Sequence, residues 1–281
     1  MKTKLSRSIA VLCAVIMAAA MCLTGCGGSS SAGGEGGGEQ ELLKKVLADG
    51  KLVVTMNTGN EPWTFVDGDD YDGFAIALVR GYCEAMEIEL EVQPMEFESM
   101  IPAVNEGTVD MVCTNLSRTV PRSQNVMFTD SIGVDYGVAV IKKGAFKKLE
   151  ELNKSGVTLT TEAGTVHEEV GKSTFPDAEM KTVDSTPNAL QAVKSSKADA
   201  FLTNLQIAKE MVAKDNTIEI MDENVFTDPM AFAVNSSYLS ASFLNSFGVY
   251  LKNIKADGTF AKMWNEYLGN DWYPDPTQVS L

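Results

Sequence analysis

The chain has 281 residues and is acidic, with 38 Asp and Glu residues against 23 Lys and Arg and a formal net charge of −15 at pH 7. This balance argues against nucleic acid or anionic lipid as the partner, because both are bound by clustered Lys and Arg. His167 is the only histidine and no Cys/His cluster is present, so we expect neither a metal site nor a cofactor.

Residues 1–25 have the pattern of a secretory signal. Basic residues near the start precede an apolar run from Ile9 to Leu23 and a small-residue cleavage site. A retained anchor helix is the alternative, but a spanning helix needs about 20 apolar residues and this run is shorter. The segment Leu23-Thr24-Gly25-Cys26 resembles the lipobox of bacterial lipoproteins. That resemblance implies a lipid anchor at Cys26, which would hold the protein on the extracytoplasmic face of the cell membrane.

Residues 26–39 are rich in Gly and Ser and predict a flexible tether, so folding should begin near residue 40. Beyond the tether, only Cys83 and Cys113 remain. A disulfide is one option in a secreted chain. Both residues lie in apolar periodic segments, however, where a free Cys behaves as a small hydrophobic residue, and we expect unpaired core thiols.

From residue 40 on, strand-like runs alternate with helical patterns. The expected strands are 52–56, 89–94, 109–114, 137–142, 157–161, 180–183, 198–202, 218–221 and 230–234. The expected helices are 74–86, 97–106, 166–172, 186–195, 205–213, 238–254 and 260–267. This alternation predicts an α/β fold of parallel sheets with right-handed crossovers. Roughly 240 residues suffice for one large domain or two lobes.

The stretch from Thr114 to Arg122 reads Thr-Asn-Leu-Ser-Arg-Thr-Val-Pro-Arg and follows a strand candidate. Ligands of open α/β sheets bind beyond the carboxyl ends of strands, and the guanidinium fork of Arg122 suits a carboxylate. Ser117 and nearby backbone amides would complete such a cradle. The alternatives are a solvated loop or a helix start capped by Thr119. Arg118 is assigned to the solvated surface.

Several short segments follow one another along the chain in a characteristic order. They are 52–54, 61–65, 71–78, 95–104, 107–110, 115–122, 127–130, 163–165, 198–201 and 255–264. This ordered set, with its spacings, resembles the extracellular solute-binding proteins of polar amino-acid ABC transporters, over about Lys51 to Tyr267.

The resemblance implies a two-lobe, periplasmic-binding-protein-like (type II) α/β fold with the ligand in the cleft between the lobes. Lobe 1 would comprise 40–132 and 232–281, and lobe 2 would comprise 137–226. The chain would cross between them near 132–136 and 226–230. Closure about this hinge traps the ligand, and the transporter recognises the closed form.

The resemblance also assigns binding roles. Arg122 matches the arginine that pairs with a ligand α-carboxylate, and Ser117 matches the hydroxyl beside it. Asn115 falls where a backbone carbonyl meets the α-ammonium. In lobe 2, Thr165 lies at a helix N-terminus that favours anions. Phe97 matches an aromatic wall of the site.

Trp63 also matches an aromatic position of the family, although that position can equally be core packing. Two positions depart from the family pattern. Asn60 replaces the usual aromatic lid. Asn204 stands where the family places an Asp that binds the ammonium, and an amide lacks that charge. Glu162, with Asn57 facing it, is our candidate for the missing charge. The alternative is that Glu162 is exposed on the surface.

We therefore expect a lipid-anchored, monomeric binding protein that delivers a small polar carboxylate or zwitterion, with an L-amino acid or close derivative as first candidate, to an ABC transporter permease. The alternatives are an enzyme on the same fold, of dehydratase or hydrolase type, or a sensory ligand-binding protein. Against an enzyme, we expect no His in the cleft, and no nucleophile–base pair is evident.

Overall fold

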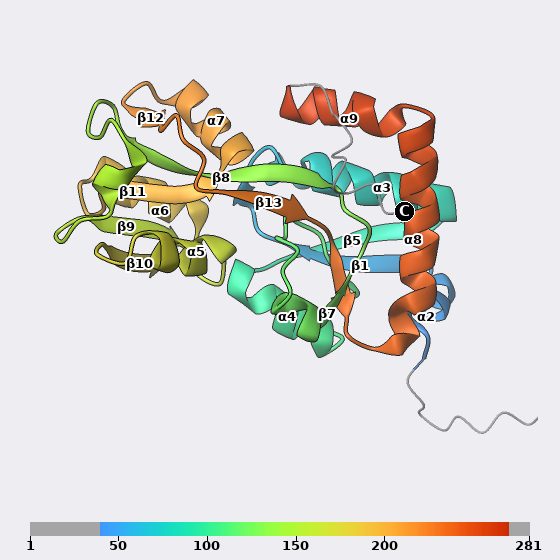
Figure 1. The fold of residues 1–281 in the computed structure, drawn as a ribbon. Coiled ribbons are helices and arrows are strands. Elements are labelled where there is room, and N and C mark those ends of the chain that lie inside the picture. The colour runs from blue at the N-terminus through green and yellow to red at the C-terminus, as the bar shows by residue number, and fades with distance from the viewer. Residues whose placement is uncertain (1–39, 270–281) are drawn as a thin grey trace, which may run out of the picture. The chain divides into compact units, whose positions relative to one another are not determined.

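Two open β-sheets organise the chain in the computed structural model, which describes residues 40–269 (Figure 1). The predicted signal segment, the tether, Cys26 and residues 270–281 lie outside this range. The first sheet has the order β5-β1-β6-β14-β7. Its strands are β1 (Lys51–Met56), β5 (Glu89–Pro94), β6 (Met111–Val112), β7 (Val126–Phe128) and β14 (Ala233–Asn235). β1 runs parallel to β5 and β6, whereas β14 is antiparallel to β6 and β7.

The second sheet has the order β10-β9-β11-β8-β12, with β13 also paired to β8. Its strands are β8 (Gly133–Lys142), β9 (Thr158–Glu162), β10 (Glu179–Val183), β11 (Ala200–Asn204), β12 (Ile218–Ile220) and β13 (Phe226–Met230). β9 is parallel to β10 and β11, and β8 is antiparallel to β11, β12 and β13. A small antiparallel sheet contains β2 (Gly59–Asn60), β3 (Thr64–Asp67) and β4 (Asp70–Asp72).

The prediction of parallel sheets is wrong for two strands. β14 in the first sheet and β8 in the second run antiparallel to their neighbours, because the chain enters each sheet from the other at these strands. β8 enters the second sheet from the first, and β13 leaves it in the opposite direction. The two strands form an antiparallel ladder from the pair Gly133–Met230 to the pair Gly137–Phe226. Figure 1 shows these two strands running side by side between the two groups of elements.

The helices are α2 (Leu42–Asp49), α3 (Phe74–Met86), α4 (Phe97–Asn105), α5 (Val166–Thr174), α6 (Thr186–Lys194), α7 (Leu205–Lys214), α8 (Ala241–Ala256) and α9 (Thr259–Leu268). Single 3-10 turns occur at Arg122–Gln124, Leu149–Leu152 and Tyr238–Ser240. α3, α8 and α9 accompany the first sheet, and α5, α6 and α7 surround the second (Figure 1). Within residues 40–269, no helix combines the length and apolar character needed to span a bilayer.

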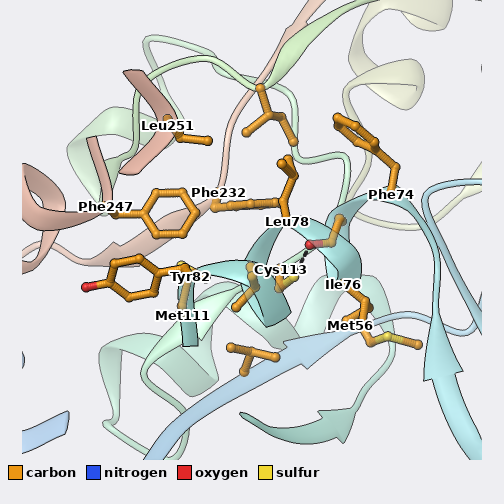
Figure 2. Close-up of a cluster of buried hydrophobic side chains, with 14 of the residues drawn as sticks. Met56, Phe74, Ile76, Leu78, Tyr82, Met111, Cys113, Phe232, Phe247 and Leu251 are labelled. Atoms are coloured by element: carbon orange, nitrogen blue, oxygen red, sulfur yellow. Dashed lines mark hydrogen bonds between the residues drawn. The ribbon is translucent and has the colours of Figure 1, made fainter. Parts of the chain in front are cut away.

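The core of the first half is built on α3, whose apolar residues recur at helical spacing. Phe74, Ile76, Leu78 and Tyr82 are almost fully buried against β1, β6 and α8, as Figure 2 shows. Gly73 opens the helix with φ +119°, and a Cβ there would lie 2.3 Å from the carbonyl oxygen of Trp63. Only glycine tolerates this backbone.

The two cysteines of this half are buried and unpaired, as predicted. The thiol of Cys113 donates a hydrogen bond to the carbonyl oxygen of Ala75 at 3.4 Å (Figure 2). Burial raises the pKa of Cys83 to about 12 and raises that of Cys113 well above its usual value, so both groups remain thiols at physiological pH.

The second sheet is covered on both faces. Successive residues of β8 point to opposite sides. Val138 and Val140 pack with α6 on one face. Ala139 and Ile141 join a separate apolar cluster on the other face. A sheet buried on both faces is a rigid support for side chains at its strand ends.

Candidate ligand-binding site

Four of the predicted site residues lie at the carboxyl ends of parallel strands, where ligands of open sheets bind. Asn57 follows β1, Asn115 follows β6, Glu162 ends β9 and Asn204 ends β11. Each is at most 5% exposed. A cavity lies among them, lined by Asn60, Phe97, Asn115, Ser117, Thr161, Glu162, Thr165, His167, Thr186, Phe201, Leu202, Thr203, Asn204 and Ile207. Its free space is about 20 Å³, which holds about one water molecule.

Arg122 joins the two halves of this site. Its guanidinium donates one hydrogen bond to the carbonyl oxygen of Ser117 and another to that of Gly164, each 2.9 Å long. The guanidinium carbon lies 5.5 Å from the ring centre of Phe97, in cation–π contact. Among residues 40–269, no carboxylate forms an ion pair with Arg122. Burial lowers the pKa of Arg122, but an arginine keeps its charge in proteins.

The loop that carries Arg122 has features of both alternatives to a carboxylate cradle, a helix start at Thr119 and a solvated loop. A 3-10 turn begins at Arg122, and its backbone N–H donates to the hydroxyl of Thr119 at 3.3 Å. Arg118 is exposed, as expected. Ser117 forms an isolated bridge with Met230. The loop is therefore anchored to β13 at one end. Arg122 does not itself line the cavity, but it contacts Ser117 and Phe97, which do.

Three asparagines form a row across the site. Asn60 donates to the side-chain oxygen of Asn115 at 3.3 Å, and Asn115 donates to that of Asn204 at 3.0 Å. Asn204 in turn donates to a carboxylate oxygen of Asp228 at 2.8 Å. Ser117 donates to the same oxygen at 3.0 Å. The row ends on a carboxylate that the sequence reading did not identify.

Asp228 lies in the middle of β13 and is 2% exposed. Burial raises the pKa of Asp228 to about 6, while the bonds from Asn204 and Ser117 and the charge of Arg122 oppose that rise. Nothing in the local sequence marks it, because its position depends on how β13 pairs with β8. Asp135 is its partner in that ladder.

Glu162 is 3% exposed, so the surface alternative is wrong. Its carboxylate accepts hydrogen bonds from the amide of Asn57, 3.3 Å to each oxygen, and from the hydroxyl of Thr186 at 2.9 Å. Thr114 orients Asn57 by donating to its side-chain oxygen at 2.9 Å. Burial raises the pKa of Glu162 to about 7, although these hydrogen bonds oppose the rise.

Thr165 directly precedes α5 and so lies at a helix N-terminus, as predicted, and its hydroxyl donates to the carbonyl oxygen of Glu162 at 2.8 Å. Two positions further on, His167 lines the cavity, so the expectation of a cleft without histidine is wrong. Its Nε2 has no hydrogen-bond partner among the described residues. Burial, together with the charge of Arg122, lowers the pKa of His167 to about 3. The imidazole is therefore neutral.

Trp63 is placed in the core and does not line the cavity. Its ring packs edge-on against Phe74 and Trp264, with centres 5.6 and 5.9 Å apart. Phe97, by contrast, lines the cavity beside Arg122. Within the described part of the chain, no group of His, Cys, Asp or Glu side chains has the arrangement of a metal site.

The chain belongs to the bacterial extracellular solute-binding proteins, family 3, whose family model matches residues 52–270. A curated relative, the arginine-binding extracellular protein ArtP of Bacillus subtilis, is 27% identical over 224 residues, covering 78% of this chain and 86% of the relative. The structure of the ancestral amino acid-binding protein AncCDT-1, a precursor of cyclohexadienyl dehydratase, is 28% identical with a TM-score of 0.75, covering 80% and 99%. An ancestral arginine-binding protein bound to arginine is 27% identical with a TM-score of 0.72, covering 78% and 99%. These findings confirm the predicted family and the two-lobe type II fold.

Proposed function

We propose that this protein captures a small zwitterionic solute, an L-amino acid or close derivative, and delivers it to an ABC importer without changing it chemically. In this proposal the protein is a monomer anchored through a lipid at Cys26. The observation that carries the proposal is the guanidinium of Arg122. It is held by two backbone carbonyls and the Phe97 ring, and no acid among residues 40–269 forms an ion pair with it. Such a group suits a ligand carboxylate.

The relatives support the choice of solute. ArtP is named as arginine-binding, and the similar solved structures include an ancestral protein bound to arginine and the amino acid-binding AncCDT-1. The site offers charges of both signs, namely the guanidinium of Arg122 and the buried carboxylates of Glu162 and Asp228. A zwitterion matches this arrangement better than a simple anion does.

The predicted lobe boundaries, 40–132 with 232–281 and 137–226, give the cavity walls to different lobes. On that division, the ion pair of Lys214 with Glu61 crosses between the lobes, and so do three contacts at the site. These three are Asn57 to Glu162, Asn115 to Asn204, and Arg122 to Gly164. An entering amino acid would replace them with contacts of its own. Since ligand contacts would exist in full only when the lobes are closed, binding would shift the population toward the closed form.

A thermal-shift screen of purified protein against L-amino acids, 2-hydroxy acids, betaines and small peptides tests the proposal. A ligand present at one hundred times its dissociation constant stabilises the folded state by about 2.7 kcal/mol. We expect at least one L-amino acid to raise the unfolding temperature and to be recovered unchanged by mass spectrometry. A screen in which no amino acid has an effect, or in which one is converted, would contradict the proposal.

A further inference from the structure

β11 ends at the neutral amide of Asn204, so the negative charge that an ammonium would need has to come from another group. The nearest carboxylate to Asn204 is Asp228, whose oxygen accepts the Asn204 amide at 2.8 Å. It sits on a different element, β13, and is 2% exposed. We propose that Asp228 sets the direction of the whole asparagine row, so that the row presents the side-chain carbonyl oxygen of Asn60, at its far end, to the ammonium of the ligand. This inference rests on the proposed function.

The direction of the row follows from hydrogen-bond chemistry. An ionised carboxylate only accepts hydrogen bonds, so Asn204 must turn its NH2 group toward Asp228. Its carbonyl oxygen then faces Asn115, which must also present its NH2 group. The carbonyl oxygen of Asn115 in turn faces Asn60, so Asn60 also presents its NH2 group and donates to Asn115. Each amide in the row therefore has its positive end toward Asp228 and its negative end away from it.

The far end of the row supplies a second observation. Asn60 lines the cavity and is 4% exposed, and its side-chain oxygen has no hydrogen-bond partner among the described residues. A buried carbonyl without a donor is costly, and an ammonium or other N–H donor in the cavity would satisfy it. Linked hydrogen bonds polarise one another, so the charge of Asp228 strengthens this acceptor from a distance.

The bond from Ser117 makes Asp228 part of the ligand site as well as of the row. Ser117 lines the cavity and donates to the same carboxylate oxygen that Asn204 contacts. With this hydroxyl hydrogen committed to Asp228, Ser117 also offers its lone pairs to a donor in the cavity. The ammonium would thus be read by oxygens whose orientation depends on one buried acid.

Isothermal titration calorimetry on purified protein tests the inference. Each L-amino acid that stabilises the wild type is compared with the 2-hydroxy acid of the same side chain, for example arginine with argininic acid. In Asp228→Asn, amino-acid affinity should fall roughly tenfold or more, about 1.4 kcal/mol, while hydroxy-acid affinity is kept or improved. Asn60→Ala should show the same selective loss without removing a buried charge. In the double variant Asn204→Asp with Asp228→Asn, a carboxylate returns beside the cavity and amino-acid affinity should recover.

Asp135→Asn is the matched control. Asp135 is an equally buried acid opposite Asp228 in the ladder. Its carboxylate accepts hydrogen bonds from the backbone N–H groups of Tyr136 and Gln206 and makes no hydrogen bond to the asparagine row. Its substitution should leave the amino-acid preference intact. Wild-type amino-acid affinity in both Asp228→Asn and Asn60→Ala, or an equal loss for the hydroxy acid in these variants, would overturn the inference. A wild type that binds no amino acid at all would instead overturn the proposed function, and the inference with it.

Discussion

Removing the guanidinium of Arg122 should abolish tight binding while leaving a folded protein. Arginine has five N–H donors, and the carbonyls of Ser117 and Gly164 take one each. The remaining donors suffice for a two-point contact with a carboxylate. Truncating one partner of a buried, hydrogen-bonded charge pair costs about 2–5 kcal/mol. Each 1.4 kcal/mol is tenfold in affinity, so Arg122→Ala should weaken binding by roughly 30-fold to several thousandfold.

Calorimetric titration of Arg122→Ala, Arg122→Lys and Arg118→Ala gives the assay. Arg122→Lys keeps the charge but loses the planar fork, so its affinity should lie between those of the alanine variant and the wild type. Arg118 is exposed, and its alanine variant should bind as the wild type does. The reasoning is refuted if Arg122→Ala retains its fold and wild-type affinity, because the loop would then have no part in binding.

Further predictions concern ionisation, backbone packing and thiols. Burial places the pKa of Glu162 at about 7 against an ordinary 4.5, so ionisation of Glu162 favours the unfolded state, and the free energy of unfolding should fall as pH rises between these values. Glu162→Gln should remove about 3 kcal/mol of that fall in urea titrations of ligand-free protein, and an unaltered pH profile would argue against it. Gly137→Ala places a Cβ 2.0 Å from the ring of Phe226, and should lower the free energy of unfolding by about 1–3 kcal/mol; an unchanged urea midpoint would show that the two crossing strands adjust freely. Cys83 and Cys113 are unpaired, so protein lacking its first 38 residues should yield two thiols to Ellman's reagent in denaturant without reductant, and none before unfolding.

Much of the fold is predictable because its signals are local. The bounds of α3 and β5 agree with those expected from apolar spacing. The helix α2 and the small sheet of β2, β3 and β4 were not predicted. These strands are two to four residues long and largely polar, so they are too short for an alternating apolar pattern to be recognised in the sequence. Their formation depends on packing against α3 and on hairpin pairing.

The site was predictable where a residue follows a strand end in a recognisable segment. Arg122, Asn115 and Glu162 come from such segments. In the structure Asn115 and Glu162 line one cavity, and Arg122 contacts Ser117 of the same lining. Asp228 could not be found in this way, because it reaches Asn204 only through the pairing of β13 with β8. The antiparallel course of these strands is also what the alternation of elements failed to predict.

His167 illustrates a different limit. The sequence marks it only as a polar residue near the start of a helix, and that position is usually solvated. In the structure it packs against Phe226, with ring centres 5.2 Å apart, and lines the cavity. Which face of α5 turns inward is decided by contacts with the second sheet, which the helix sequence alone does not contain.

The most direct test of the central claim is a crystal structure of the protein with the amino acid that gives the largest thermal shift. We predict that the ligand binds among the residues that line the present cavity, with its carboxylate within hydrogen-bond distance of the Arg122 guanidinium and its ammonium facing the oxygens of Asn60 or Ser117. A ligand bound elsewhere, or one bound in the cavity with its carboxylate away from Arg122, would contradict the account.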